Sequence, residues 1–271
     1  MKGIDRREFL KIGGMAAIAG LGGKAAFEIL APGKLEAAQQ IPLTKGKHWA
    51  MVVDTTKMDD ALMDVCIEAC HKEHNVPNLG NPKEEIKWIW KETYEHAFPG
   101  QEHEYIGERF HGMNFLLMCN HCTNPPCVRV CPTQSTWKRE DGVVMMDMHR
   151  CIGCRFCMAA CPYGARSFNW GDPQRVRTDE KLMPMNPGFP RNKDYPTRSK
   201  GVVEKCNFCA ERLAKGDQPA CVEAAAKVRK GALVFGDLAD PHSEVRKVLK
   251  ENYTIRRKPE LGTGPNLFFI V

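Results

Sequence analysis

The sequence lacks the features that mark a substrate-converting enzyme or a nucleic-acid-binding protein. It contains no glycine-rich nucleotide loop and no recognisable pair of nucleophile and base. The net charge is +6, but the lysines and arginines are scattered and form no stripe interleaved with aromatic residues. We therefore expect neither a substrate site in this chain nor a nucleic-acid partner.

The N-terminal region also lacks a hydrophobic run long enough to cross a bilayer, which takes about 20 residues. The apolar run from Ile12 to Gly23 is only about 12 residues long. It follows Arg6 and Arg7, and a twin arginine before Phe-Leu-Lys is typical of a signal for twin-arginine (Tat) export. We interpret residues 1–38 as this signal, which is either cleaved or, because no A-x-A site is present, retained as an anchor. The expected location is the extracytoplasmic (periplasmic) face of the cytoplasmic membrane.

Cysteine, in contrast, is abundant. Eight of the 13 cysteines form two quartets, each followed by proline. The quartets are Cys119-x2-Cys122-x4-Cys127-x3-Cys131 and Cys151-x2-Cys154-x2-Cys157-x3-Cys161. The second is the run of bacterial two-cluster ferredoxins, in which three thiolates bind one [4Fe-4S] cluster and the fourth binds its neighbour.

This exchange of the last cysteine predicts two centres. Cluster A takes Cys119, Cys122, Cys127 and Cys161, and cluster B takes Cys151, Cys154, Cys157 and Cys131. Disulfides are disfavoured because they belong mainly to short secreted scaffolds. Zinc ribbons use two C-x2-C pairs without a trailing Cys-Pro, so zinc is the weaker interpretation.

The remaining cysteines predict a third centre and a lost fourth one. Pairing the outer quartets as the inner two are paired gives cluster C, with Cys206, Cys209, Cys221 and Cys70. Its mate retains one of four ligands, and the positions of this vacated site are Met58 (Asp60 if the loop is shorter), Met63, Cys66 and Ala225. Methionine is a weak ligand beside thiolate. We predict three [4Fe-4S] clusters, apolar packing at the vacated site, and Cys66 as a buried free thiol.

An internal repeat indicates the fold class. The alternating stretches His48–Asp54 and Gly142–Asp147 each read as a strand that leads to a cysteine loop. We expect an α+β fold of tandem, pseudo-symmetric, bacterial-ferredoxin-like modules with loop-rich insertions. The first module is split between residues 48–112 and 200–240, the second is residues 113–199, and residues 241–271 form a C-terminal helix and docking tail.

The insertions give further expectations. The segment Glu84–Tyr94 fits a short helix, and residues 171–200 read as a loop. The histidines at 71, 74, 96, 103 and 111 match no haem, zinc or di-iron spacing, so we interpret them as surface or core residues. Gly153 is expected to allow a close backbone approach, and Phe156 and Tyr163 to shield the clusters from water.

The whole pattern resembles the four-cluster ferredoxin-type iron–sulfur subunits of membrane respiratory oxidoreductases. Besides the cysteines, the resemblance rests on Lys205-Cys206-Asn207-Phe208-Cys209, on Pro219 to Ala224, on Phe235 to Pro241 and on Lys258 to Thr263. The twin arginine, the spacing of Met58 and Met63, and the segment His71 to Pro77 are most similar to the Tat-exported O subunits of DsrMKJOP sulfite-reduction complexes. This resemblance implies an integral membrane quinone subunit of polysulfide-reductase type and a multihaem cytochrome c as partners.

We therefore interpret the chain as an electron-transfer subunit without its own substrate site. It would relay electrons between a quinone-reactive membrane subunit and the other redox subunits of a sulfur-metabolism complex. The alternatives are a subunit serving a molybdopterin reductase or a hydrogenase, a structural module that binds metal without redox activity, and an enzyme acting at an open iron.

Overall fold

The computed structural model describes residues 46–271, apart from 174, 179–180, 185–188 and 197. The predicted export signal, with Arg6 and Arg7, lies outside the described residues. Within them, no helix is both long enough and apolar enough to cross a membrane.

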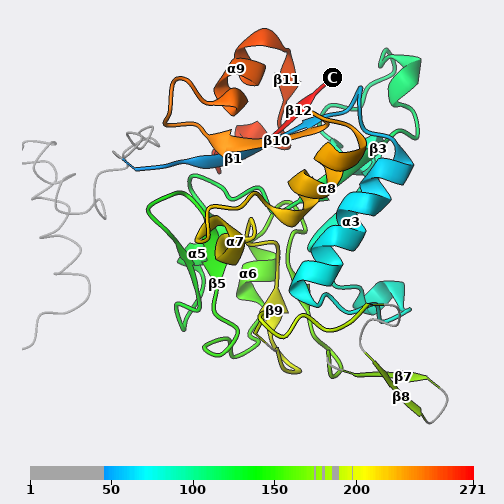
Figure 1. The fold of residues 1–271 in the computed structure, drawn as a ribbon, viewed down its shortest axis with the longest axis vertical. Helices are drawn as coiled ribbons and strands as arrows, with labels where there is room; N and C mark the ends of the chain where they lie inside the picture. Colours follow the sequence, from blue (N-terminus) through cyan, green and yellow to red (C-terminus); the bar gives the residue numbers. More distant parts are fainter. Residues whose placement is uncertain (1–45, 174, 179–180, 185–188, 197) are drawn as a thin grey trace, which may run out of the picture. The chain divides into compact units, whose positions relative to one another are not determined.

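A four-stranded sheet organises the fold around β1 (Trp49–Asp54). This strand pairs antiparallel with β10 (Leu233–Asp237) and parallel with β12 (Leu267–Ile270), which pairs in turn with β11 (Thr254–Ile255). Figure 1 shows β1, β10 and β12 side by side, although they are distant in the sequence. The predicted strand His48–Asp54 is thus confirmed, as the centre of a sheet.

The two faces of β1 bury different partners because successive side chains of a strand point to opposite faces. Met51 and Val53 belong to the main apolar core, whereas Ala50 and Val52 belong to a smaller one. The smaller core includes residues of α9 (Glu244–Glu251), and Figure 1 shows α9 on that side of the sheet. Residues 241–271 therefore contain the expected helix, α9, and also contribute the two strands β11 and β12 to the sheet around β1.

Two helices pack against each other on the main-core side of the sheet. The first, α3 (Asp60–His74), begins where the Asp59 side chain accepts a hydrogen bond from the Leu62 N–H, 2.9 Å long. The second, α8 (Ala220–Val228), begins after Pro219, because a proline ring disfavours a helical conformation of the residue before it. The pair brings cysteines of the first and last parts of the chain to one interface.

The middle of the chain consists of short elements around the two inner quartets. The strand β3 (Asn114–Met118) leads to Cys119, and β4 (Thr136–Lys138) forms a hairpin with β5 (Val144–Met146). Gly142 turns this hairpin with φ of 84°, which side chains rarely adopt. The remaining bounds are α4 (Tyr94–Ala97), η2 (Glu108–Phe110), α5 (Pro126–Arg129), α6 (Phe156–Ala159), β6 (Ser167–Phe168), β9 (Val203–Glu204), α7 (Ala210–Leu213) and η3 (Pro259–Leu261).

Three local expectations were wrong. The segment Glu84–Tyr94 is not a helix: η1 (Pro82–Glu84) precedes β2 (Ile89–Thr93), which pairs antiparallel with β3. Residues 171–200 are not only loop, because β7 (Arg175–Thr178) and β8 (Lys181–Pro184) pair antiparallel. Tyr163 is buried and lines a cavity with Cys119 and Cys161 as expected, but Phe156 is 58% exposed and lines neither of the two cysteine-lined cavities.

Candidate metal centres

The four cysteines predicted for cluster A line one cavity. Cys119 follows β3, Cys122 lies in the next loop, Cys127 lies in α5, and Cys161 follows α6. Burial and then the other three cysteines raise the pKa of the Cys122 thiol, because several thiolates facing one another repel. Four sulfurs from two quartets thus converge on one space.

The four cysteines predicted for cluster B line a second cavity. Cys131 comes from the first quartet, and Cys151, Cys154 and Cys157 come from the second. Burial raises the pKa of Cys131, but hydrogen bonds from Ser135, Thr133 and the backbone outweigh burial and lower it to about 7. The Ser135 Oγ lies 3.2 Å from the Cys131 Sγ.

The loop of the second quartet depends on one glycine. A Cβ at Gly153 would lie 2.3 Å from the Gly201 carbonyl oxygen, and the φ of Gly153 is 71°. The expected close approach is present, and the structure identifies its partner as the backbone that precedes β9.

The four cysteines predicted for cluster C come from three elements. Cys70 lies on α3, Cys206 and Cys209 follow β9, and Cys221 lies on α8. Burial and then the other three thiols raise the pKa of Cys70 well above its usual value. The Ala220 N–H donates to the Cys209 Sγ at 3.4 Å, as does the Phe208 N–H to the Cys206 Sγ.

The three groups and the vacated site form a row. Where two groups adjoin, burial is the main cause that raises the pKa of a cysteine. A cysteine of the neighbouring group raises that pKa further. These pairs are Cys157 with Cys127, Cys206 with Cys119, and Cys221 with Cys66. Contacts agree with these pairs: Cys127 and Cys157 belong to one cluster, the His121 ring stacks on Phe208, and the Cys66 Sγ lies 3.7 Å from the Cys221 carbonyl oxygen. The order along the row is therefore B, A, C and then the vacated site.

The positions of the vacated site are all buried in the main apolar core: Met58, Met63, Cys66 and Ala225. The Cys66 Sγ lies 3.7 Å from the Cys221 carbonyl oxygen, and burial raises the pKa of this free thiol to about 12. Asp60, the alternative to Met58, is exposed and accepts a hydrogen bond from Asn114. The geometry therefore favours Met58 as the vacated position.

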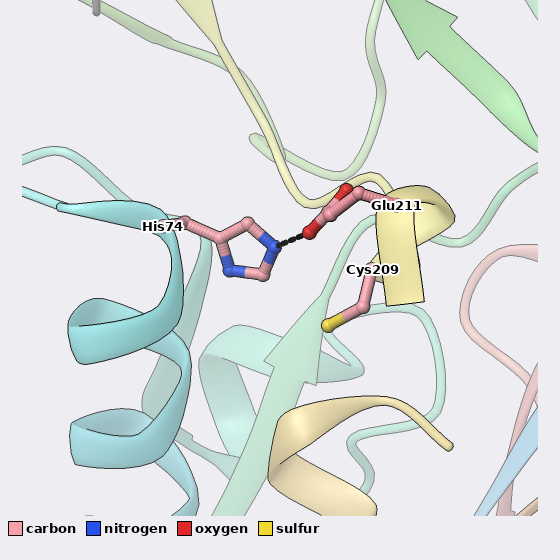
Figure 2. A group of neighbouring side chains, drawn as sticks. All are labelled: His74, Cys209 and Glu211. Atoms are coloured by element: carbon pink, nitrogen blue, oxygen red, sulfur yellow. Dashed lines mark hydrogen bonds and ion pairs between the residues drawn. The ribbon is translucent and has the colours of Figure 1, made fainter. Parts of the chain in front are cut away.

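A polar group beside the cysteines of cluster C was not predicted from the sequence. Figure 2 shows His74, Glu211 and Cys209 facing one another, and their ligand atoms lie within 4.8 Å. The His74 Nε2 lies 2.5 Å from a Glu211 oxygen, its Nδ1 lies 3.1 Å from the Cys70 carbonyl, and its ring stacks on Trp88. His74 follows Cys70 by four residues on α3, and this helical spacing was the available signal.

Two buried cations were also overlooked. Arg166 donates from Nη2 to the Cys127 Sγ, 3.1 Å away. The Lys205 Nζ donates to the Cys206 carbonyl, 2.7 Å away, and to the Val144 carbonyl. Both are nearly fully buried, and both lie directly beside cysteines of the row. A basic residue close to a cysteine run is common on protein surfaces, so the sequence alone did not single them out.

The donor set fits iron–sulfur clusters. Soft thiolates select iron–sulfur clusters, zinc or copper(I), and all 13 cysteines are free of disulfides. The first two cavities each combine three cysteines of one quartet with the last cysteine of the other. That exchange is the ferredoxin arrangement rather than that of a zinc ribbon.

Comparisons with known proteins agree with this donor set. Residues 112–175 match the family model described as "4Fe-4S dicluster domain". The chain is 39% identical to the Hdr-like menaquinol oxidoreductase iron-sulfur subunit 1 of Archaeoglobus fulgidus, over 98% of this chain and 97% of that protein. It is 38% identical to the arsenate respiratory reductase iron-sulfur subunit ArrB of a Shewanella species, over 76% and 89%. It is 32% identical to the menaquinone reductase iron-sulfur cluster-binding subunit of Nitratidesulfovibrio vulgaris, over 82% and 88%.

Proposed function

Because this chain belongs to the 4Fe-4S ferredoxin-type iron–sulfur subunits of menaquinol- and polysulfide-reductase-like membrane oxidoreductase complexes, we propose that its cysteine row carries electrons between a quinone-reactive membrane subunit and the other redox subunits of its complex. Its relatives are iron–sulfur subunits of reductase complexes, so the chain is an electron-transfer subunit and not a catalytic one.

The observation that carries this proposal is the order B, A, C of three four-cysteine groups. A [4Fe-4S] cluster bound by four thiolates supplies reversible one-electron transfer. Neighbouring groups also adjoin in the structure: Cys127 and Cys157 belong to one small cluster, and the His121 ring between Cys119 and Cys122 stacks on Phe208 between Cys206 and Cys209. Electrons can therefore pass from one group to the next inside one protein. The ligand assignments of clusters A, B and C made from the sequence are the ones proposed here.

We count three clusters and not four. The support is the vacated site, where apolar side chains fill the core and one thiol remains, Cys66. Since this site lies beyond cluster C, the row loses a terminal member and keeps an unbroken series of three. On this count the two proposed modules differ in cofactor content.

The proposed setting is the periplasmic face of the membrane, reached by Tat export through Arg6 and Arg7. The named functions of relatives as menaquinol oxidoreductase, menaquinone reductase and polysulfide reductase subunits support a polysulfide-reductase-type quinone subunit as the partner. A sulfite-reduction complex of DsrMKJOP type with a multihaem cytochrome c is the finer proposal. The similarity to arsenate and tetrathionate reductase subunits favours the alternative, a molybdopterin reductase complex.

The test is the cofactor content of the full chain purified without oxygen. Three clusters predict about twelve irons and about twelve acid-labile sulfides per chain, with EPR signals after reduction. About sixteen of each would overturn the vacated site. Zinc without sulfide would overturn electron transfer itself. In membranes of the native host, the addition of a menaquinol should reduce the EPR-active clusters, and a lack of reduction would contradict the quinone partner.

A further inference from the structure

Arg166 is a buried cation without a carboxylate partner among the described residues. Only 5% of the residue is exposed, and none of the ion pairs in the described part of the chain includes it. It lies between Cys161 and β6, in the segment that leaves the second quartet. A charge in the protein interior is costly unless other groups compensate it, so its neighbours must do so.

The neighbours of Arg166 belong to two centres. Its Nη2 donates to the Cys127 Sγ of group A at 3.1 Å and to the Thr136 Oγ1 at 2.8 Å, and its Nη1 lies 3.6 Å from the Met146 Sδ. Burial lowers the pKa of Arg166, but the charges of Cys127, Cys157 and Cys119 outweigh burial and raise it. Arg166 itself lines the cavity of group A, whereas Met146 and Cys157 line the cavity of group B. The guanidinium therefore lies between the two groups, and thiolates of both compensate its charge.

The groups around cluster C differ. Glu211 is an acid beside Cys70 and Cys209. Burial and the other thiols are the larger causes that raise the pKa values of these two cysteines, and the charge of Glu211 raises them further. The cation beside Cys206 is Lys205, whose ammonium donates to backbone carbonyls and not to sulfur. Among the described residues, the Arg166 guanidinium donates to the sulfur of Cys127 and to no cysteine of group C.

We propose that Arg166 is a shared positioning residue of centres A and B, which fixes the Cys127 sulfur by a hydrogen bond and raises the reduction potentials of both centres relative to C. This inference rests on the proposed function, because it presumes that both groups bind clusters. Reduction adds one electron and therefore one negative charge to a centre. A nearby buried cation stabilises the reduced state more than the oxidised state, and a hydrogen bond to a ligand sulfur acts in the same direction.

The test is an anaerobic redox titration of the full chain, followed by EPR, with Arg166→Gln and Arg166→Lys. In Arg166→Gln, the midpoint potentials of clusters A and B should each fall by about 59 mV or more. For one electron, this corresponds to at least a tenfold decrease in the equilibrium constant for reduction. The third should stay. Arg166→Lys retains the charge but loses the forked contact with Cys127 and Thr136, so the same two potentials should fall less.

Two controls separate a local from a general effect. Arg139→Gln removes an equal charge from a more exposed ion pair with Asp141 and should leave all three potentials in place. Lys205→Gln removes the buried cation beside Cys206. It should lower the midpoint potential of cluster C and leave that of cluster B unchanged. If Arg166→Gln does not assemble its clusters, Arg166→Lys decides by the same criterion.

The outcomes distinguish the inference from the proposed function. A wild-type protein without iron–sulfur clusters would overturn the function. Three clusters whose potentials stay in place in both Arg166 variants, or all shift together, would overturn the role of Arg166 and leave the function intact.

Discussion

At the scale of single residues, two cysteines on one helix are expected to behave differently. Cys66 and Cys70 are one turn apart on α3, but Cys70 interacts with all three other cysteines of cluster C, whereas Cys66 adjoins Cys221. Cys70→Ala should lower the iron content by about four per chain, since it removes a predicted ligand. Cys66→Ala should keep about twelve irons and lower the stability by about 1 kcal/mol, the cost of a small core cavity.

The measurement is iron and sulfide per chain together with the thermal midpoint of each variant. Equal iron loss in the two variants would contradict the separation of Cys66 from the ligand set.

The Cys66 thiol should also resist alkylation in the folded protein. Burial raises its pKa from 9.0 to about 12, and the thiolate is the reactive form. In an unfolded chain the thiol ionises near pH 9, so its contribution to stability is complete below that pH and is lost as the pH rises from about 9 to about 12.

Iodoacetamide at pH 8 followed by peptide mass spectrometry should therefore find Cys66 unmodified until denaturant is added. Between pH 9 and 10.5, Cys66→Ala should lose less stability than the wild type. Rapid modification of Cys66 in the native protein would show that the α3–α8 interface opens.

The residue scale also shows what spacing can and cannot predict. Sulfur positions follow from spacing because a cubane requires thiolates at fixed reach, and the cysteines of A and B do line shared cavities. Arg166 and His74 escaped prediction because their roles depend on contacts across 39 and 137 residues of chain, with Cys127 and Glu211. Such distant pairings leave no periodic signal in the sequence.

At the scale of elements, the loop of the second quartet depends on its contact with the backbone before β9. Gly153→Ala should break this loop, because its new Cβ would lie 2.3 Å from the Gly201 carbonyl oxygen. We expect loss of the cluster B iron, about four per chain. The matched control is Gly164→Ala, which also has a positive φ (64°) but meets no atom within 4 Å.

Gly164→Ala thus measures backbone strain alone, and iron analysis with EPR compares the two variants. If both lose the same cluster, strain and not the close approach explains the glycine.

The wrong helix prediction has an element-scale cause as well. Glu84–Tyr94 carries apolar residues at helical spacing, but Trp88, Ile89 and Trp90 are consecutive and all buried. Ile89 and Trp90 are buried in strand β2, which pairs with β3 so that Ile89 lies opposite Met118, and Trp88 is buried directly before this strand. The tertiary partner thus overrode a weak local period. Conversely, β1 and the hairpin at Gly142 were predictable because strand alternation and a glycine turn are local signals.

At the scale of the whole molecule, the sheet shows why domain boundaries are hard to read from sequence. β1 comes from the start of the described chain, whereas β10 and β12 come from near its end, so one sheet joins segments that are distant in the sequence. The proposed split of the first module between residues 48–112 and 200–240 came from the cysteine count. The place of β12 beside β1 had no comparable signal, because parallel pairing depends on contacts distant in sequence.

The cysteine groups of the row differ in their exposure to solvent, so the order in which the clusters are lost can be predicted. Three of the four cysteines of group B are partly exposed, and Ile152 beside them is 67% exposed. Three of the four in group C are buried, between α3 and α8 or beside them. Mild oxidation with ferricyanide in the presence of a chelator should therefore release about four irons in a first phase, from cluster B, and the iron of cluster C last.

Iron release and EPR, sampled over time on the full chain, measure this order. In Cys154→Ser, which weakens cluster B beforehand, the first phase should shrink or disappear while the later phases keep their rates. In Cys209→Ser the first phase should remain. A first phase that persists in Cys154→Ser, or a single phase for all iron in the wild type, would contradict the order along the row. The vacated site adjoins cluster C. Release of the cluster C iron last would therefore place the vacated site at the protected end of the row, where apolar packing of α3 against α8 closes it from solvent.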